Sequence, residues 1–246
     1  MEFSKGAVDR AARLILDVWQ LPPGPDGELP AGGPGMDELV RAMTAVTWWR
    51  GLHTGPLTKV AANLRYHVAK EGGQIDGRID VSQRLKRRPT MIDKLAREPQ
   101  MNLTQMADIG GVRARLPSLA HVQAVSRRLA KTWTVVRTRD YVTHPKASGY
   151  RAIHHVVRRD GRLIEVQLRT VRQDAWANQV EDDGRDRGVG FKFGFGAPEV
   201  HAYYVVMAEA FEALDRGRQL TPDLVARLNE AFTAARPLLP RTAFRP

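Results

Sequence analysis

The Asp160-Gly161 dipeptide constrains the fold of this chain more than any other feature. It lies between two runs, residues 150–158 and 162–170, in which polar and apolar side chains alternate. Asp-Gly between two such runs is the strongest short-range signal of a β-hairpin. Side chains alternate between the faces of a strand, and directly opposed residues share a face. One face is predicted to carry Ile153, His155, Val157, Ile164, Val166 and Leu168, and the other Tyr150, Ala152, His154, Glu165, Gln167 and Arg169.

The periodicity of the remaining chain predicts an α/β core between helical flanks. Apolar residues at three- and four-residue spacing indicate helices, and alternating runs indicate strands. The predicted helices are 5–19, 36–50, 57–70, 90–97, 118–131, 171–183, 198–216 and 222–235, and the other strands are 75–81, 109–116 and 133–141. We expect a helical N-terminal extension with a Pro/Gly-rich connector over 1–56, an α/β core over 57–197 and a C-terminal helical segment over 198–246.

The charge of the chain is positive and uneven. It has 38 Lys and Arg against 27 Asp and Glu, a formal net charge of +11. Residues 127–172 hold 12 basic and 3 acidic side chains, which gives 12 − 3 = +9. Such a stretch attracts phosphate groups or nucleic acid, although a solvated surface explains it equally well. The charge indicates a class of partner and not a reaction.

Several classes of protein are excluded by what the sequence lacks. Without cysteine there is no disulfide, no thiolate zinc site and no cysteine nucleophile. No phosphate-binding P-loop, His-Glu-x-x-His or Gly-x-Ser-x-Gly motif occurs, and no histidines have the spacing of metal ligands. No apolar run approaches the roughly 18 residues of a membrane helix, and the N-terminus lacks the pattern of a secretory signal. We therefore expect no membrane association and a cytoplasmic location.

A series of short polar and basic segments runs through the predicted core. In order, they are Arg84-Leu85-Lys86-Arg87-Arg88-Pro89-Thr90, Asp108-Ile109-Gly110-Gly111-Val112-Arg113, Asp140-Tyr141 with Pro145-Lys146, Gly149-Tyr150-Arg151 with His154, and Glu165-Val166-Gln167-Leu168-Arg169-Thr170. Together they resemble the RelA/SpoT alarmone synthetase domain, over roughly residues 57–197. The resemblance implies a mixed β-sheet flanked by helices, similar to nucleotidyltransferases, with extra helices at both ends. It also implies transfer of the β,γ-pyrophosphate of ATP to the 3′-hydroxyl of an acceptor nucleotide.

The resemblance implies a catalytic pair of acids. Asp108 resembles the family's Mg²⁺-holding carboxylate, and Glu165 resembles the second acid, which helps to bind the metal and activates the attacking hydroxyl. Oxygen ligands of this kind suit Mg²⁺, which keeps several waters and bridges substrate phosphates. Taken singly, Asp108 could instead cap a turn before a strand, and Glu165 could pair with an arginine on a basic face.

The resemblance also implies two sets of substrate ligands. The first set binds ATP and its phosphates: Arg84, Lys86, Arg113 and, with a looser spacing, Lys192. The second set binds the acceptor: Tyr150 would stack on its base, Lys146 would meet its 5′ phosphates, and His154 and Gln167 would orient its ribose or the transferred group. A solvated basic run and a structural salt bridge are the simpler alternatives for the arginines and lysines. Trp176 is expected in the core.

The identity of the acceptor stays open at the level of the sequence. The leading hypothesis is GDP or GTP, which would give (p)ppGpp. The alternatives are a growth-arresting toxin that modifies the 3′ CCA end of tRNA or makes (p)ppApp, and a non-catalytic nucleic-acid-binding module. A neutralising antitoxin and a homo-oligomer are possible partners that the family suggests. Asn178 stands where the family often has an acid, which is a departure from its pattern.

Overall fold

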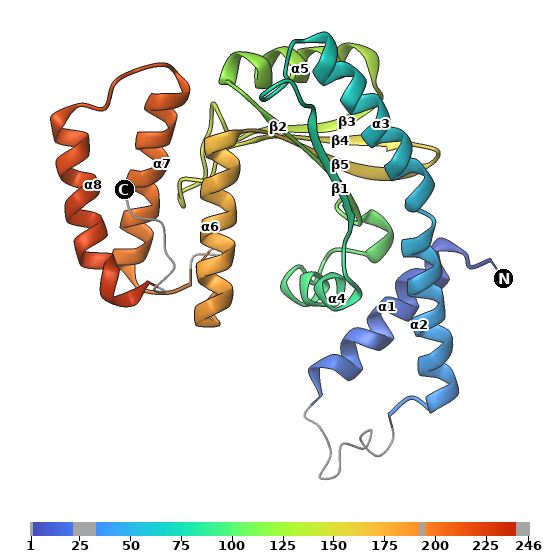
Figure 1. Cartoon of the computed structure of the whole chain (residues 1–246). Coiled ribbons are helices and arrows are strands. Elements are labelled where there is room, and N and C mark those ends of the chain that lie inside the picture. The colour runs from blue at the N-terminus through green and yellow to red at the C-terminus, as the bar shows by residue number, and fades with distance from the viewer. Residues whose placement is uncertain (1, 22–32, 192–194, 240–246) are drawn as a thin grey trace. The chain divides into compact units, whose positions relative to one another are not determined.

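The computed structural model describes residues 2–21, 33–191 and 195–239. Its sheet is mixed and has the strand order β1-β2-β5-β4-β3 (Figure 1). The strands are β1 (Asp80–Leu85), β2 (Gly110–Leu116), β3 (Val135–Asp140), β4 (Ile153–Arg159) and β5 (Arg162–Thr170). The first strand begins later than predicted because Ile75 and Arg78 form a separate bridge around Asp76 and Gly77, both of which have positive φ. The α/β fold with a mixed sheet is thus confirmed.

The predicted hairpin is present as β4 and β5. Asp160 and Gly161 have φ values of 47° and 73°, and positive φ at both central residues is the pattern of a type I′ turn. All six residues predicted for the apolar face are buried. One of them is His155, whose ring nitrogens lie 2.9 Å from the Ser126 hydroxyl and 2.8 Å from the Thr138 hydroxyl. The face that carries Glu165 and Gln167 is therefore the one available for chemistry.

The helices follow the predicted periodicity closely. They are α1 (Lys5–Gln20), α2 (Met36–Gly51), α3 (Thr54–Lys70), α4 (Arg88–Arg97), α5 (Leu119–Thr132), α6 (Val171–Arg187), α7 (Pro198–Asp215) and α8 (Pro222–Ala235). Ser118 and Thr221 cap α5 and α8 with their side chains, as their positions before the apolar periodicity predict. Helix α4 begins before the predicted start, because Pro89 lies in its first turn, where a missing N–H costs nothing. No helix among the described residues is long and apolar enough to cross a membrane.

The chain divides into two compact units. The first unit comprises Met1–Asn63, Ser82–Val112 and Val156–Glu165, and the second comprises Leu64–Val81, Arg113–His155 and Val166–Pro246. In the first unit, α1 lies against both α2 and α4 (Figure 1). Asp9 of α1 accepts hydrogen bonds from the backbone and the hydroxyl of Thr104, each at 2.8 Å. The N-terminal helices thus share one core with the segment that leads into β2; its buried residues are Val8, Ala12, Leu16, Val46, Trp49, Met91, Ile92, Leu95, Leu103, Met106 and Ile109.

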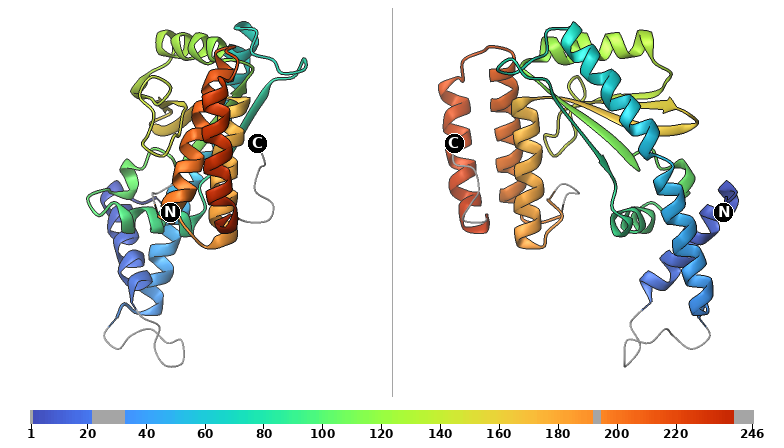
Figure 2. Two further views of the ribbon diagram at one scale, coloured as in Figure 1. Left: turned by 90° about the vertical axis from the view of Figure 1, so that its left-hand side faces the viewer. Right: turned by 45° about the vertical axis from the view of Figure 1, so that its right-hand side comes forward.

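The second unit has its own apolar core, which is formed largely by the C-terminal helices. Helices α6, α7 and α8 lie side by side in succession (Figure 2). Trp176 is 4% exposed, and its indole N–H donates to the carbonyl of Tyr204 at 2.8 Å. The Tyr204 hydroxyl donates to the buried carboxylate of Asp183 at 2.5 Å. The prediction that Trp176 belongs to the core is confirmed.

Candidate active site

The first cluster of functional side chains surrounds Asp108. Lys86 Nζ donates to Asp108 Oδ2 and Lys94 Nζ donates to Oδ1, both at 2.9 Å. These three residues, the Asp108 cluster, are part-exposed: the side chains of Lys86, Lys94 and Asp108 are 12%, 20% and 21% exposed. Two cations therefore share one anion at a place that solvent and small ligands can reach.

The backbone around Lys86 is fixed on both sides. Lys86 follows β1 directly, and its N–H donates to the Ile109 carbonyl at 2.8 Å. Its own carbonyl accepts from Arg50 Nε at 2.7 Å, so helix α2 holds this residue in place. Lys94 lies on α4, whose buried residues Met91, Ile92 and Leu95 belong to the core of the first unit. The backbone that carries the two lysines is thus held by hydrogen bonds and by packing, while their ammonium groups lie at the ends of long side chains.

The charges of this cluster control the ionisation of Asp108. Burial alone would raise the pKa of its carboxyl group, but the Lys86 and Lys94 ammonium groups outweigh burial and lower that pKa below its ordinary value. Asp108 is therefore an anion at neutral pH. Among the described residues, no three His, Asp or Glu side chains gather as a preformed metal site. Asp108 is a carboxylate of the kind that Mg²⁺ takes as one of its one or two protein ligands, beside waters and substrate phosphates.

The other predicted residues of the first unit are Glu165 and Arg84. Glu165 is half-buried on β5, between the fully buried side chains of Ile164 and Val166. Its carboxylate therefore lies on the face of the strand that is opposite the apolar core. Arg84 is exposed on β1, and none of the ion pairs among the described residues involves it. Neither Asp108 nor Glu165 points into the apolar interior.

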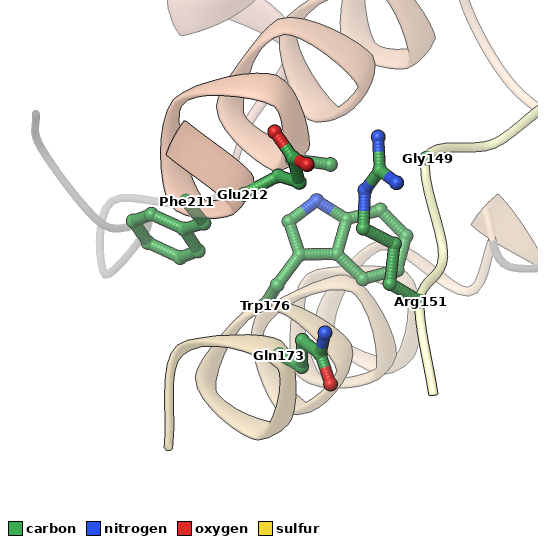
Figure 3. Close-up of a pocket in the computed structure, with 7 residues that line it drawn as sticks. Gly149, Arg151, Gln173, Trp176, Phe211 and Glu212 are labelled. Atoms are coloured by element: carbon green, nitrogen blue, oxygen red, sulfur yellow. The ribbon is translucent and has the colours of Figure 1, made fainter. Parts of the chain in front are cut away.

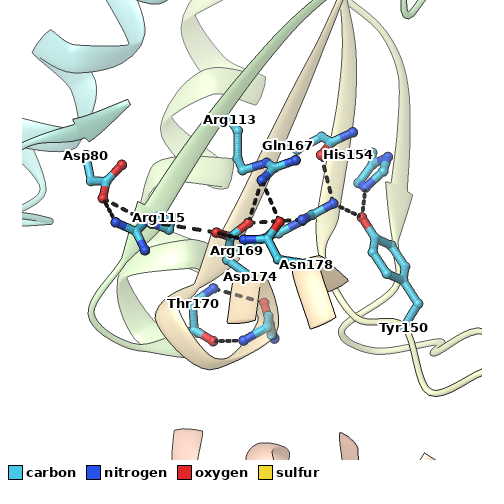
Figure 4. Close-up of polar contacts among 11 residues, drawn as sticks. Asp80, Arg113, Arg115, Tyr150, His154, Gln167, Arg169, Thr170, Asp174 and Asn178 are labelled. Carbon is cyan, nitrogen blue, oxygen red and sulfur yellow. Dashed lines mark hydrogen bonds and ion pairs between the residues drawn. The ribbon is translucent and has the colours of Figure 1, made fainter. Parts of the chain in front are cut away.

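The second cluster surrounds Asp174, in the first turn of α6. Arg113 Nη1 and Arg169 Nη1 both donate to Asp174 Oδ1, at 2.9 and 3.0 Å. Asn178 Nδ2 donates to Oδ2 at 3.1 Å, and Arg113 also donates to Asn178 Oδ1 at 3.3 Å. We call these four residues the Asp174 cluster (Figure 4). The Asp174 side chain is only 4% exposed and that of Arg169 is 6% exposed. One buried carboxylate thus accepts hydrogen bonds from two arginines, and a third, Arg115, lies 4.0 Å from its Oδ2.

Arg169 connects the Asp174 cluster to three of the predicted acceptor residues. Its Nη2 donates to the Tyr150 hydroxyl at 2.8 Å and to Gln167 Oε1 at 2.9 Å (Figure 4). The guanidinium carbon also lies 5.2 Å from the centroid of the Tyr150 ring, within the range of a cation–π contact. The Tyr150 hydroxyl lies 2.6 Å from His154 Nε2. Because this hydroxyl accepts from Arg169, its own proton is available for His154.

Lys146 contacts two aromatic rings of the same unit. Its Nζ lies 4.9 Å from the Tyr141 ring centroid and 5.3 Å from that of Tyr150. The segment between these two tyrosines includes Gly149, which has a φ of 90°. A Cβ atom at Gly149 would lie 2.9 Å from the Cβ of Ala208 on α7, so only glycine allows this approach. This close contact holds Tyr150 next to the helical bundle.

A small pocket lies behind this segment. Its lining includes Arg151 and Gln173 beside the Trp176 indole (Figure 3). Arg151 Nε and Gln173 Nε2 are buried there and have no hydrogen-bond partner among the described residues. About 10 Å³ is open to a water-sized sphere, which is far too small for a nucleotide. The pocket is therefore part of the support of the Tyr150 segment and not a substrate site.

The structure groups most of the residues predicted from the sequence. Asp108 and Lys86 meet directly in the first unit, which also contains Arg84 and Glu165. Tyr150, His154, Gln167, Lys146 and Arg113 belong to one network of contacts in the second unit. Lys192 lies outside the described residues. Sequence reasoning assigned no role to Lys94, Arg169, Asp174 or Tyr141. The available signals were the family-like segments that contain Tyr141 and Arg169, and the spacing of one helical turn between Asp174 and Asn178.

Comparisons with known proteins agree with this picture. The family model described as "Region found in RelA / SpoT proteins" matches residues 83–184. An uncharacterized protein of Mycobacterium tuberculosis is 33% identical over 149 residues, which is 58% of this chain and 53% of that protein. The chain thus spans about half the length of this relative. The GTP pyrophosphokinase YjbM of Bacillus subtilis is 30% identical over 166 residues, which is 63% of this chain and 75% of that enzyme.

The fold has solved counterparts. The crystal structure of small alarmone synthetase 1 from Bacillus subtilis, bound to its product pppGpp, matches with a TM-score of 0.53 and 25% identity. That match covers 69% of this chain and 94% of the synthetase. Three-quarters of the Bacillus subtilis pyrophosphokinase is aligned at 30% identity, and the segments from Arg84 to Thr170 that resemble the family lie inside residues 83–184. On these grounds, the chain belongs to the RelA/SpoT family.

Proposed function

We propose that this chain transfers the β,γ-pyrophosphate of ATP to the 3′-hydroxyl of GDP or GTP, which gives (p)ppGpp and AMP. The observation that supports this most is the presence of two different clusters suited to phosphate and nucleotide. One is a carboxylate that holds two part-exposed lysines, and the other is an aromatic ring surrounded by guanidinium, ammonium and imidazole groups. The first suits a triphosphate and its cation, and the second suits a purine nucleotide.

The Asp108 cluster is proposed as the ATP side. Lys86 and Lys94 would act as point charges on the triphosphate, and the exposed Arg84 would grip phosphate oxygens in its planar fork. Lys94 joins this set because its Nζ lies 2.9 Å from Asp108, the same distance as that of Lys86. Arg113, the further predicted phosphate ligand, belongs to the second unit.

Asp108 and Glu165 are the residues that would hold Mg²⁺. When bound, this ion neutralises the charge that develops on the phosphate oxygens. Both oxygens of Asp108 accept from lysines, so a cation binds there more readily when one lysine turns to another anion. The triphosphate offers that lysine a new anionic partner. We therefore expect ATP to increase the affinity of the protein for Mg²⁺.

Glu165 is proposed as the general base. It would accept the proton of the acceptor's 3′-hydroxyl while the 3′ oxygen forms a bond to the β-phosphorus of ATP. The bond between that phosphorus and the α,β-bridging oxygen breaks in the same step, and AMP leaves with the bridging oxygen. Gln167 and Arg169 follow Glu165 at alternate positions of β5, so the strand carries the base next to the acceptor ligands.

Tyr150 and its neighbours are proposed as the acceptor side. A base stacked on Tyr150 would gain about 1–3 kcal/mol. Lys146 contacts this ring in the structure, so the 5′ phosphates of the acceptor would draw the ammonium group away from the ring as the base takes its place. His154 and Gln167 would orient the ribose or the transferred group through hydrogen bonds.

The test is an assay of transfer with four acceptors. The protein is incubated with γ-labelled ATP, Mg²⁺ and GDP, GTP, ATP or deacylated tRNA, with the Asp108→Asn variant as the control for a contaminating kinase. We expect labelled (p)ppGpp and one AMP per transfer. Transfer to ATP or tRNA alone would contradict the proposed acceptor. No transfer by folded protein would contradict an enzymatic role and favour a nucleic-acid-binding module.

A second candidate, a toxin that pyrophosphorylates the 3′ CCA end of tRNA and is neutralised by an antitoxin, is favoured by one observation. Arg137 and Arg139 are exposed on the edge strand β3, and Arg127 and Lys131 are exposed on α5, which precedes it. Exposed arginines and lysines of this kind bind polyanions through counterion release, so binding to tRNA would weaken steeply with salt. A steep salt dependence with tRNA and a shallow one with GTP would identify which acceptor these residues serve.

A further inference from the structure

We propose that Asp174 is a positioning residue for the acceptor nucleotide, because it orients Tyr150 through Arg169. This inference rests on the proposed function of Tyr150 as the stacking residue. The Asp174 side chain is 4% exposed, and its two oxygens already accept hydrogen bonds from protein donors. It therefore acts on the substrate only through its neighbours.

The start of α6 holds Asp174 in place. Thr170 and Gln173 form a capping box: the Gln173 N–H donates to the Thr170 hydroxyl at 3.1 Å, and the Thr170 N–H donates to Gln173 Oε1 at 3.0 Å. An aspartate in the first turn is also favoured by the helix dipole. The carboxylate is thus fixed by a rigid helix terminus, directly after the strand that carries Gln167 and Arg169.

Arg169 links Asp174 to Tyr150 because its two terminal nitrogens donate to different residues. Nη1 donates to Asp174, and Nη2 donates to the Tyr150 hydroxyl and to Gln167. Arg169 Nε is buried and has no hydrogen-bond partner in the described part of the chain, so the terminal nitrogens alone fix the guanidinium. A lysine could not replace this planar fork. The orientation of Tyr150 therefore depends on Arg169, and that of Arg169 on Asp174.

The charge of Asp174 is as important as its shape. Arg113 and Arg169 donate to the same oxygen, so their two positive charges lie close together with Asp174 between them. With a neutral side chain at 174, the guanidinium groups would repel each other, and Arg169 would keep a buried charge without an anion. We expect Arg169 to turn away and the Tyr150 hydroxyl to lose its donor.

The experiment compares Asp174→Asn with Glu71→Gln. Glu71 is a carboxylate of the same unit that accepts from Arg128 at 2.9 Å, and it makes no hydrogen bond or ion pair with Thr170 or Tyr150 among the described residues. For Asp174→Asn we expect the KM for GTP to rise about tenfold or more, because charged hydrogen bonds are lost, and the KM for ATP to rise less, because Asp174 also holds Arg113. Glu71→Gln should leave the ratio of the two KM values unchanged. An equal rise of both KM values in Asp174→Asn would overturn the proposal.

A double-mutant cycle tests the route through Tyr150. Tyr150→Phe removes only the hydroxyl that accepts from Arg169. If Asp174 acts through this bond, Asp174→Asn should raise the KM for GTP much less in the Tyr150→Phe background than in the wild type. Effects that simply multiply would overturn the proposed route.

Two further measurements separate this proposal from the proposed function and from misfolding. GDP binding without ATP is followed by the fluorescence of Trp176, whose ring centroid lies 6.2 Å from that of Tyr150. If the wild type binds GDP but makes no product, the proposed function fails, and a loss of GDP binding in Asp174→Asn still supports the positioning role. If Asp174→Asn does not fold, Asn178→Ala, which removes one hydrogen bond to Asp174, should weaken GDP binding selectively. An unchanged affinity in that variant would contradict the proposal.

Discussion

The Asp108 and Asp174 clusters each surround one carboxylate with cationic side chains, but they differ in the type of cation and in exposure to solvent. Each holds cationic side chains on one carboxylate: Lys86 and Lys94 at Asp108, and Arg113 and Arg169 at Asp174, where Arg115 forms a third ion pair at 4.0 Å. Around Asp108 the cations are lysines and the carboxylate is 21% exposed, whereas around Asp174 they are arginines and the carboxylate is 4% exposed. Lysine is a mobile point charge, and arginine is a planar fork with fixed directions.

This difference indicates different tasks. The lysines around Asp108 can exchange one anion for another, which suits a place where a triphosphate and a cation arrive together. The arginines around Asp174 are buried and joined to further hydrogen bonds, which suits a scaffold that stays constant while the substrate binds. Variants of the two clusters and of their neighbours distinguish an exchangeable cluster from a fixed one.

The largest effect is expected for Glu165→Gln. If Glu165 accepts the proton of the attacking hydroxyl, the amide should lower kcat by about 10²–10⁴-fold, because it cannot act as a base. The affinity for a non-hydrolysable ATP analogue should stay near that of the wild type, since the Asp108 cluster is intact. The measurement is single-turnover transfer together with calorimetric binding of the analogue.

Glu209→Gln is the matched control for this variant. Glu209 lies on α7 and forms an exposed pair with Arg227 at 2.9 Å. The same loss of charge there should leave transfer unchanged. Near-normal rates in Glu165→Gln would remove this residue from the chemistry.

The second prediction compares the stability cost of removing each carboxylate. Asp174→Ala should lower the free energy of unfolding by about 3–5 kcal/mol, because it leaves two arginines without their buried anion. Asp108→Ala should lower it by only about 1 kcal/mol, because its part-exposed lysines can turn to solvent. Urea denaturation of both variants at pH 7 measures the two costs. Equal costs would show that both clusters are structural and would end the distinction between them.

The third prediction concerns pH and two of the buried histidines, His53 of the first unit and His155 of the second. Burial, together with Arg162, lowers the pKa of His53 to about 4, and burial, together with His154, lowers the pKa of His155 to about 4. Between pH 6.5 and 4 the unfolded chain binds more protons at these positions, so stability should fall as the pH falls through this window. The loss should reach at most about 3 kcal/mol per histidine.

Replacement of either histidine should flatten this dependence. In His53→Gln and in His155→Gln, the free energy of unfolding should change less between pH 7 and pH 4 than in the wild type, although each variant starts from a lower stability. Urea denaturation at a series of pH values gives the slope. A slope that both replacements leave at the wild-type value would assign the acid sensitivity to other groups.

The sequence predicted the parts of the fold that local rules control. The Asp160-Gly161 turn, the apolar face of the hairpin and the caps at Ser118 and Thr221 all depend on residues close together in the chain. The start of β1 was predicted wrongly, because the alternation from Ile75 to Val81 does not distinguish a small bridge from the strand after it.

Contacts between distant segments were beyond the reach of sequence reasoning. Lys94 lies on α4 and Asp108 in the loop before β2, and no sequence motif contains both residues. The resemblance draws attention to Asn178, where the family often has an acid, and not to Asp174 one turn before it. The anion that holds Arg113 lies at 174 in this chain, a fact that only the packing of α6 against the arginines reveals.

The smallest effect is expected for Tyr150→Ala. Loss of the stacking ring should weaken acceptor binding by about 1–2 kcal/mol, which is about 5- to 30-fold in affinity, without changing the affinity for ATP. Lys146 would lose one of its two aromatic partners but keep Tyr141, so its charge stays near the site. Tyr66→Ala is the matched control, since Tyr66 is an exposed tyrosine on α3 with a lysine, Lys70, near its ring. Equilibrium titration with GDP measures both variants. If Tyr150→Ala weakened ATP binding as much as GDP binding, the assignment of the fixed cluster to the acceptor would be wrong.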